Sequence, residues 1–259
     1  MTATDPAADR KLAFTATGDD LTTLLHHPAT EVLLAVLDNP ALDETQLCLL
    51  LDRKDLPAEI LEEVATRKNL LKNYRVKRAL AFHPHTPRLA SLRFIKDLYL
   101  MDLAQLALSV GVPTELKRIA EEQLLARLSQ LPLGQKITLA RRGPGRVAGA
   151  LLAEGHPQIL SVVLDNAYLT EAQVLKALAR EKLSAAVVHA IAQHRRWSCI
   201  YSVRLALIRA PGTTLATVLA FLPEINATDL HDLSEPGIVS APLRNYLQAE
   251  LARRSNPSE

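Results

Sequence analysis

The chain has 259 residues, of which 48% are hydrophobic and 22% charged, so it can bury a sizeable core and is not a disordered tail. Nine glycines and an aromatic content of 4% argue against Gly-rich nucleotide-binding folds and β-sandwiches, and two cysteines are too few for a disulfide scaffold. The formal net charge of +2 is small, but it conceals alternating acidic and basic blocks.

Capping residues and apolar spacing predict helices along the whole first half of the chain. Asp43 stands three residues before Gln46, as a capping box requires, and Thr86 precedes Pro87, so the threonine can cap a helix whose first turn tolerates proline. Apolar residues follow at helical spacing. The expected helices, about eight in number, lie at 19–26, 30–38, 43–52, 57–68, 72–82, 87–96, 99–109 and 113–130.

The first half of the chain recurs in the second half at an offset of about 127 residues, here called the repeat offset. The sequence Val-Leu-Asp-Asn occurs at Val36–Asn39 and again at Val163–Asn166. Roughly 30 of about 116 positions match without a gap when residues 12–127 are aligned with residues 139–254. Because chance does not keep one register over such a length, we predict that the chain is two copies of one module.

The spacing of the helix stops predicts the architecture. Stops recur about every 12 to 18 residues, which is too short for a coiled coil and typical of helix pairs in a stack. We therefore predict an all-α fold, an α-solenoid of stacked helix pairs built by tandem duplication. The expected organisation is a disordered N-terminus at 1–11, a first module at 12–130, a second module at 131–254 continuous with the first, and a disordered tail at 255–259.

Two segments resemble a known helical-repeat signature. Val76–Leu80 (Val-Lys-Arg-Ala-Leu) and Val203–Leu207 (Val-Arg-Leu-Ala-Leu) look like the VR-x-A-L signature of the second helix in HEAT-type repeats, and Leu116–Ala120 is a weaker echo. The resemblance implies a HEAT-like or leucine-rich-repeat-variant protein of an uncharacterised bacterial group, and it carries no catalytic residue across. Three further segments share the resemblance: Asp38–Pro40, His83–Pro87 and Ala210–Thr213.

Charge distribution is the strongest functional signal. Residues 1–63 have a net charge of about −9, whereas Val64–Lys96 contains no acid and has a net charge of about +9. Two further blocks, Gln123–Ala153 and Lys182–Pro223, also lack acids. One interpretation is that these bases pair with acidic helices next to them. The other is that an anionic partner relieves their mutual repulsion, and both interpretations remain open.

Some basic positions recur at the repeat offset. Lys68 corresponds to Arg195, and Lys77 corresponds to Arg204. In a regular solenoid equivalent positions fall on one face, so we predict a single extended surface, here called the basic ridge. The candidate binding residues of the basic ridge are Arg67, Lys68, Arg75, Lys77, Arg78, Arg195, Arg196 and Arg204.

The partner of the basic ridge is predicted only by class. An acidic protein and a nucleic acid would use the same bases. The fold and the absence of catalytic motifs favour a non-enzymatic scaffold that binds another protein, and a nucleic-acid-binding protein is the alternative. The sequence leaves the oligomeric state open.

No catalytic, metal or cofactor site is predicted. The pairs His26–His27 and His83 with His85 have no cysteine or carboxylate cluster at ligand spacing, so they are expected to be surface or helix-end residues. Trp197 and Tyr201 could form a base-stacking platform, although a repeated aromatic more often packs between helices. No P-loop, nucleophile elbow, zinc-protease motif or dinucleotide fingerprint occurs, so we expect no enzyme and no cofactor.

The sequence predicts a cytoplasmic protein that does not insert into a membrane. Asp5 and Asp9 precede any apolar run, which is unlike a signal peptide. The longest uncharged stretch, 210–223, is shorter than the about 20 residues that a membrane-spanning helix needs.

Overall fold

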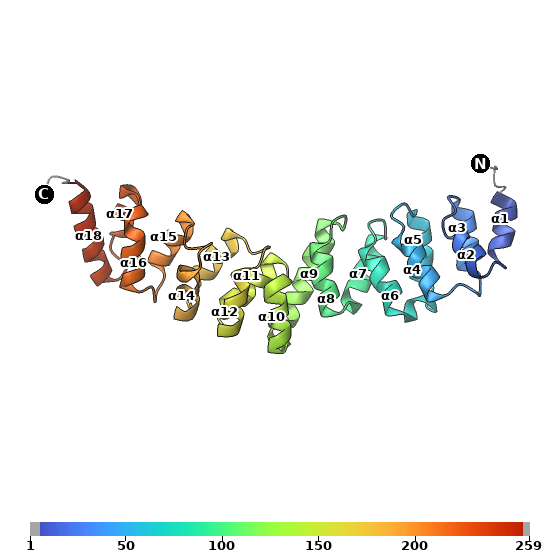
Figure 1. The fold of residues 1–259 in the computed structure, drawn as a ribbon, viewed down its shortest axis with the longest axis horizontal. Helices are drawn as coiled ribbons and strands as arrows, with labels where there is room; N and C mark the ends of the chain where they lie inside the picture. The colour runs from blue at the N-terminus through green and yellow to red at the C-terminus, as the bar shows by residue number, and fades with distance from the viewer. Residues whose placement is uncertain (1–5, 256–259) are drawn as a thin grey trace. The chain divides into compact units, whose positions relative to one another are not determined.

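The structure is a computed structural model that describes residues 6–255, and the regular elements in this range are all helical (Figure 1). No strand occurs among these residues, which confirms the predicted all-α class. The chain consists of two compact units, Met1–Ala126 and Arg127–Glu259. No helix in the described range is both long and apolar enough to cross a membrane.

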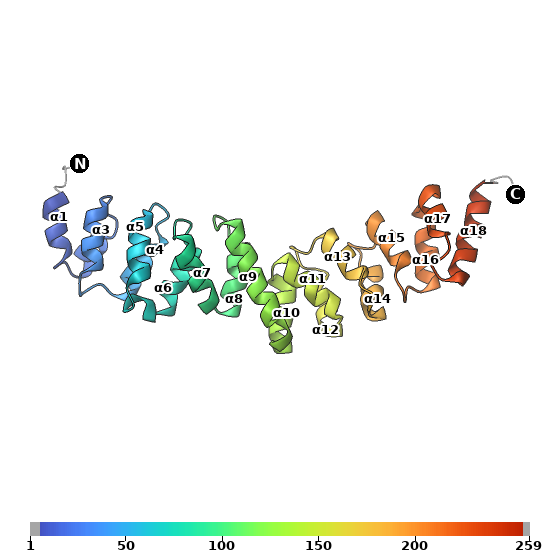
Figure 2. The same ribbon diagram turned by 180° about the vertical axis from the view of Figure 1, so that it is seen from behind.

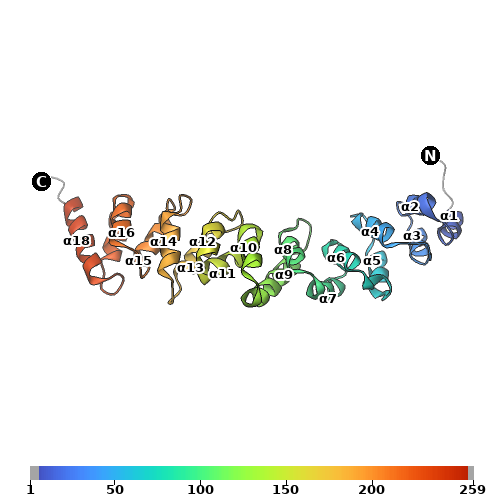
Figure 3. The same ribbon diagram turned by 60° about the horizontal axis from the view of Figure 1, so that its bottom comes forward.

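The first unit contains two layers of short helices. Helices α1, α3 and α5 pack side by side in one layer, and α4, α6 and α8 pack side by side in the other (Figures 1 and 3). The elements are α1 (Pro6–Ala13), α2 (Gly18–Leu24), α3 (Thr30–Leu37), α4 (Glu44–Asp52), α5 (Ala58–Thr66), the 3-10 helix η1 (Leu70–Lys72), α6 (Tyr74–Phe82), α7 (Arg88–Asp97), α8 (Leu100–Leu108) and α9 (Thr114–Arg127).

The second unit has the same internal arrangement. Helices α10, α12 and α14 pack in one layer, and α11, α13 and α15 pack in the other (Figure 2). The elements are the 3-10 helix η2 (Leu128–Gln130), α10 (Leu133–Arg142), α11 (Gly145–Glu154), α12 (Pro157–Val163), α13 (Glu171–Leu178), α14 (Ala185–Gln193), α15 (Tyr201–Arg209), α16 (Leu215–Phe221), the 3-10 helix η3 (Leu222–Glu224), α17 (Ala227–Leu233) and α18 (Ala241–Ser255).

Helix starts recur at a constant spacing between the two units. Within the described residues, each of α1 to α9 has a counterpart among α10 to α18 that begins one repeat offset later. For two pairs both ends match: Ala58–Thr66 with Ala185–Gln193, and Tyr74–Phe82 with Tyr201–Arg209. The same register in sequence therefore corresponds to the same register in secondary structure.

The predicted helices are found within a few residues of their expected bounds, with one omission. Residues 6–11, expected to be disordered, form most of α1, and residues 1–5 and 256–259 of the predicted disordered ends lie outside the described residues. α1 is a helix because it packs on α3 and buries Ala13 completely. The capping box of Asp43 and Gln46 is confirmed, but Thr86 is no cap, because α7 begins after Pro87.

Apolar helix faces form the core of each unit. In α5 the side chains of Ile60, Leu61 and Val64 are completely buried, at the spacing that one helix face requires. Burying such a side chain contributes about 1.5–3 kcal/mol. These helices are too short to be stable alone, so packing between neighbours holds them.

Buried asparagines tie neighbouring helices of one layer together. The Nδ2 group of Asn39 donates to the carbonyls of Ala13 and Ala16 at 2.7 and 2.8 Å. The Nδ2 group of Asn166 donates in the same way to the carbonyls of Ala140 and Gly143 at 2.8 and 3.1 Å. Carbonyls at a helix C-terminus lack an intrahelical partner, and these amides supply one.

Candidate binding surfaces

Most of the basic ridge in the first unit is engaged in contacts within the chain. Arg67 forms ion pairs of 2.7 Å with both Asp38 and Glu63 and donates to the carbonyl of Leu37 at 2.5 Å. The guanidinium therefore caps the end of α3 while two carboxylates neutralise its charge.

The next three bases face acids from other helices. Lys77 pairs with Asp97 at 2.8 Å, and Arg78 pairs with Asp102 at 2.7 Å. Arg75, with a largely exposed side chain, lies 3.9 Å from a carboxylate oxygen of Glu44. Of the two open interpretations, pairing with acids of neighbouring helices thus describes Arg67, Arg75, Lys77 and Arg78, and these acids come from the ends or bodies of α3, α4, α5, α7 and α8.

In the second unit Arg196 and Arg204 are also engaged in contacts within the chain. Arg204 pairs with Glu224, as Lys77 pairs with Asp97 at the equivalent positions of the first unit, and it also donates to the carbonyl of Ser198. Arg196 stacks on the ring of Trp197, 4.2 Å from the ring centroid. Its guanidinium also donates to the carbonyls of Asn166 and Leu169. Both bases hold neighbouring segments together.

Two bases of the ridge are open to solvent. The side chains of Lys68 and Arg195 are exposed and form no hydrogen bond or ion pair with any other residue that the structure describes. They occupy equivalent positions, each just after a helix of its own unit. Sequence reasoning thus located two bases without a partner among residues 6–255, together with six whose side chains face acids or carbonyls of the chain.

The repeated tyrosines each hydrogen-bond an aspartate of a later helix. Tyr74 hydrogen-bonds Asp102 and accepts from the backbone N–H of Tyr99 at 3.0 Å. Burial, followed by the hydrogen bond to Asp102, raises the pKa of Tyr74 to about 12. Tyr201 makes the equivalent hydrogen bond to Asp229, so each tyrosine links its helix to a later helix of the same unit.

Trp197 is no base-stacking platform. Its side chain is 1% exposed, and its indole N–H donates to the carbonyl of Leu164 at 2.8 Å. The ring is thus fixed against the end of α12 and offers no face for a base.

His83 and His85 form hydrogen bonds with backbone groups. The Nε2 atom of His83 lies 2.7 Å from the carbonyl of Arg53, and its Nδ1 atom accepts from the N–H of His85 at 3.2 Å. His85 in turn contacts the carbonyl of Leu56 through its own Nδ1 atom. Burial lowers the pKa of His83 below its ordinary value of 6.5.

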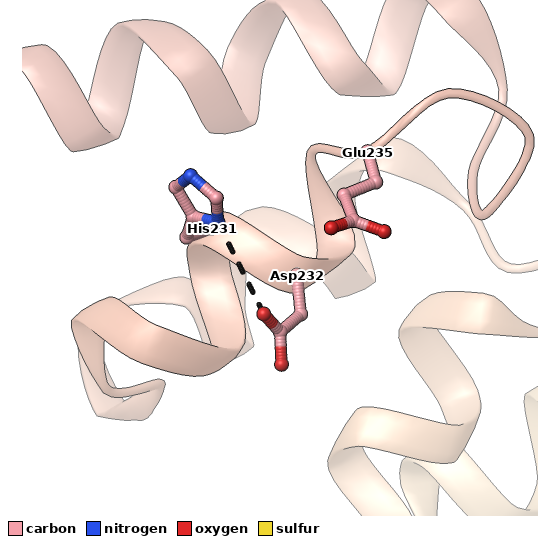
Figure 4. A group of neighbouring side chains, drawn as sticks. All are labelled: His231, Asp232 and Glu235. Carbon is pink, nitrogen blue, oxygen red and sulfur yellow. Dashed lines mark ion pairs between the residues drawn. The ribbon is translucent and has the colours of Figure 1, made fainter.

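One cluster of metal-ligating side chain types was missed by sequence reasoning. His231, Asp232 and Glu235 bring one ligand atom each within 4.8 Å of the others at the end of α17 (Figure 4). The group is the single one of its kind among residues 6–255. All three side chains are exposed, and His231 lies 4.0 Å from its neighbour Asp232. The cluster lacks the enclosure and the supporting hydrogen bonds that fix metal ligands.

A cleft opens between α4 and the start of α6 in the first unit. It has a volume of about 350 Å³, and we call it the α4–α6 cleft. Leu42 and Leu70 are half-buried there, so the cleft has an apolar floor that solvent reaches. Its lining residues are Leu42, Asp43, Glu44, Leu47, Asn69, Leu70, Lys72, Asn73 and Val76.

The comparisons with known proteins give no match. Neither protein-family models, nor curated proteins, nor solved structures contain a significant match to this chain.

Proposed function

We propose that the chain is a non-enzymatic scaffold that binds another protein on the surface of its helical repeats. In this proposal it is an α-solenoid built by tandem duplication of a module of about 127 residues, similar to HEAT-like proteins. The constant spacing of the helix starts supports the duplication, as does the recurrence of the asparagine bonds of Asn39 and Asn166.

The observation that carries the proposal is apolar exposure on one pair of equivalent helices. On α7 the side chain of Leu89 is 79% exposed, and on α16 Leu215 and Leu219 are 42% and 43% exposed. Leu215 and Leu219 are four residues apart and share a helix face. Single exposed leucines are ordinary, but a pair one turn apart is the anchor type that protein interfaces bury.

The proposal is tested by capture combined with substitution. The tagged chain, cross-linked in native lysate, is expected to retain a reproducible protein partner, and Leu89→Glu and Leu219→Glu are expected to lose it. Glu62→Gln on the exposed side of α5 is the matched control and is expected to retain it. Failure to capture any protein reproducibly, or equal capture by the leucine variants, contradicts the proposal.

A second candidate function is nucleic-acid binding, which the exposure of Lys68 and Arg195 favours. The double variant Lys68→Glu, Arg195→Glu is then expected to abolish a gel shift with duplex DNA, single-stranded DNA or RNA. The affinity of the unaltered protein is expected to fall with added salt, because phosphate contacts release counterions. Absence of any shift at low salt rejects this candidate.

A further inference from the structure

The two units differ at the α4–α6 cleft. Leu70 lies in the cleft of the first unit, and the equivalent residue of the second unit is Trp197. Asn69, beside it, corresponds to Arg196. Two small or medium side chains of one unit are therefore replaced in the other by an indole and a guanidinium.

Burial shows the effect of this difference. Trp197 is 1% exposed, and Leu169, the counterpart of Leu42, is also 1% exposed. In the first unit Leu42 and Leu70 both remain partly open to solvent. The apolar residues at these two positions are thus buried in the second unit and partly open to solvent in the first.

Hydrogen bonding shows the same difference. The guanidinium of Arg196 donates to the carbonyls of Asn166 and Leu169 at 3.2 Å. In the first unit the carbonyl of Leu42 has no donor among the described residues, and the exposed amide of Asn69 donates to nothing in that range. The α4–α6 cleft therefore presents an acceptor as well as an apolar floor.

Charge at the rim favours a cation. Asp43 and Glu44 line one side of the cleft, and Lys72 is the single base among the lining residues. The carboxylate of Glu44 lies 3.9 Å from its ion-pair partner Arg75, a distance long enough for a second guanidinium to bind the same carboxylate more closely.

We propose that the α4–α6 cleft binds a segment of another protein that presents a tryptophan next to an arginine. The indole covers Leu42 and Leu70, and the guanidinium donates to the Leu42 carbonyl and faces Glu44. The second unit carries an arginine and a tryptophan side by side at the positions of Asn69 and Leu70, with the Arg196 guanidinium stacked 4.2 Å from the centroid of the Trp197 ring. The inference rests on the proposed scaffold function and names the chemistry of one partner segment.

The probe is a fluorescein-labelled peptide, Gln-His-Arg-Arg-Trp-Ser, which copies residues 193–198 of the chain. Its anisotropy is expected to rise and saturate when the full chain is added, with a dissociation constant of about 10⁻⁴ M. The same peptide with alanine in place of tryptophan is expected to bind at least about tenfold more weakly, because the indole supplies most of the buried apolar area.

Substitutions in the cleft give the decisive comparison. The double variant Asn69→Arg, Leu70→Trp gives the cleft the two side chains of the second unit, and it is expected to weaken peptide binding at least about tenfold while keeping the far-UV circular dichroism of the unaltered chain. Glu44→Lys keeps the apolar floor intact and is expected to weaken binding several-fold. The matched control, Glu62→Lys on α5, reverses a charge away from the cleft and is expected to leave binding unchanged.

Two results overturn the proposal: no saturable binding to the unaltered chain at 1 mM peptide (about tenfold above the expected dissociation constant), or equal binding by the filled variant. These results are distinct from a failure of the scaffold function. If capture depends on Leu89 and Leu219 but the peptide does not bind, the cleft inference fails and the scaffold proposal stands.

Discussion

Asn39 and Asn166 show how a single buried polar residue fixes the spacing of two helices. Each amide is at most 5% exposed and has both its donor and its acceptor engaged, since the Oδ1 atom accepts from the backbone N–H two residues later. Burying an amide costs little free energy when all its hydrogen bonds are formed. Without the asparagine, the buried carbonyls that it pairs with would have no hydrogen-bond donor.

Replacing either asparagine is therefore expected to be costly. Asn39→Ala leaves two carbonyls and one N–H without a partner, and we expect a loss of at least about 2 kcal/mol in the free energy of unfolding. Urea unfolding followed by circular dichroism measures it. Asn245→Ala on the exposed face of α18 is the control, expected within about 0.5 kcal/mol of the unaltered chain. A similar small effect for Asn39→Ala would show that water replaces the amide.

His83 is expected to make the chain sensitive to mild acid. Its pKa in the folded chain lies below 6.5, because burial first and then the nearby Lys54 and His85 disfavour the cation, while the carbonyl of Arg53 and the carboxylate of Asp55 oppose this effect less strongly. The unfolded chain therefore takes up the proton first as the pH falls. The contribution of neutral His83 to the free energy of unfolding is intact above about pH 6.5 and is lost progressively below that pH.

The measurement compares urea midpoints at about pH 7.5 and 5.5, on either side of the ordinary histidine pKa. We expect His83→Gln to reduce the difference between the two midpoints, and His231→Gln, at an exposed site, to leave it unchanged. An equal pH dependence in His83→Gln would place the acid sensitivity in another group.

Among the elements, helices were predictable where their signals are local. The capping box at Asp43 and the apolar stripe of Ile60, Leu61 and Val64 depend on residues within one or two turns, and both are confirmed. α1 was missed because its stability comes from packing on α3. The eight residues of α1 are largely polar, and their sequence alone does not indicate this packing. The partner of a base is equally invisible in sequence, because Lys77 and Asp97 meet only after α6 and α7 pack.

The basic ridge is consequently expected to affect stability when its charge is reversed. The side chain of Arg204 is 12% exposed and that of Lys77 is 29% exposed, and each faces a carboxylate. We expect Arg204→Glu to cost about 3 kcal/mol and Lys77→Glu about 1 kcal/mol, since reversal leaves two like charges together and the more buried site suffers more.

Thermal unfolding measures both effects, and Lys68→Glu at the solvent-exposed position is the control. An unchanged melting temperature in Arg204→Glu would mean that the base is only loosely held and stays available to a partner.

On the scale of the whole molecule, the two units share the spacing of their helix starts and several contacts, and they differ locally. The helix starts, the buried asparagines and the tyrosine–aspartate bonds recur, whereas Asn69–Leu70 and Arg196–Trp197 do not. These shared features were predictable because identical residues mark them in the sequence. The α4–α6 cleft could not be predicted, because it depends on which side chain covers Leu42.

If the two modules form one continuous stack, as the sequence predicts, neither is expected to keep its full stability alone. The separate fragments 1–130 and 131–259 each expose an apolar end face, so both should unfold at lower urea concentrations than the intact chain. Circular dichroism at matched chain concentrations gives the midpoints. Midpoints equal to those of the intact chain would show that the modules are independent.

Side chains that donate hydrogen bonds to distant backbone carbonyls lie later in the chain than the carbonyls that accept them. Arg53 donates to Leu25, Arg67 to Leu37 and Arg254 to Ile225, in each case from a later residue to one 28 to 30 positions earlier. A helix made early therefore keeps open carbonyls at its end until about one more helix pair has been synthesised. During translation the helix pairs would therefore be completed in order from the N-terminus. Each pair would gain the hydrogen bonds to its helix-end carbonyls only after the next pair has been synthesised.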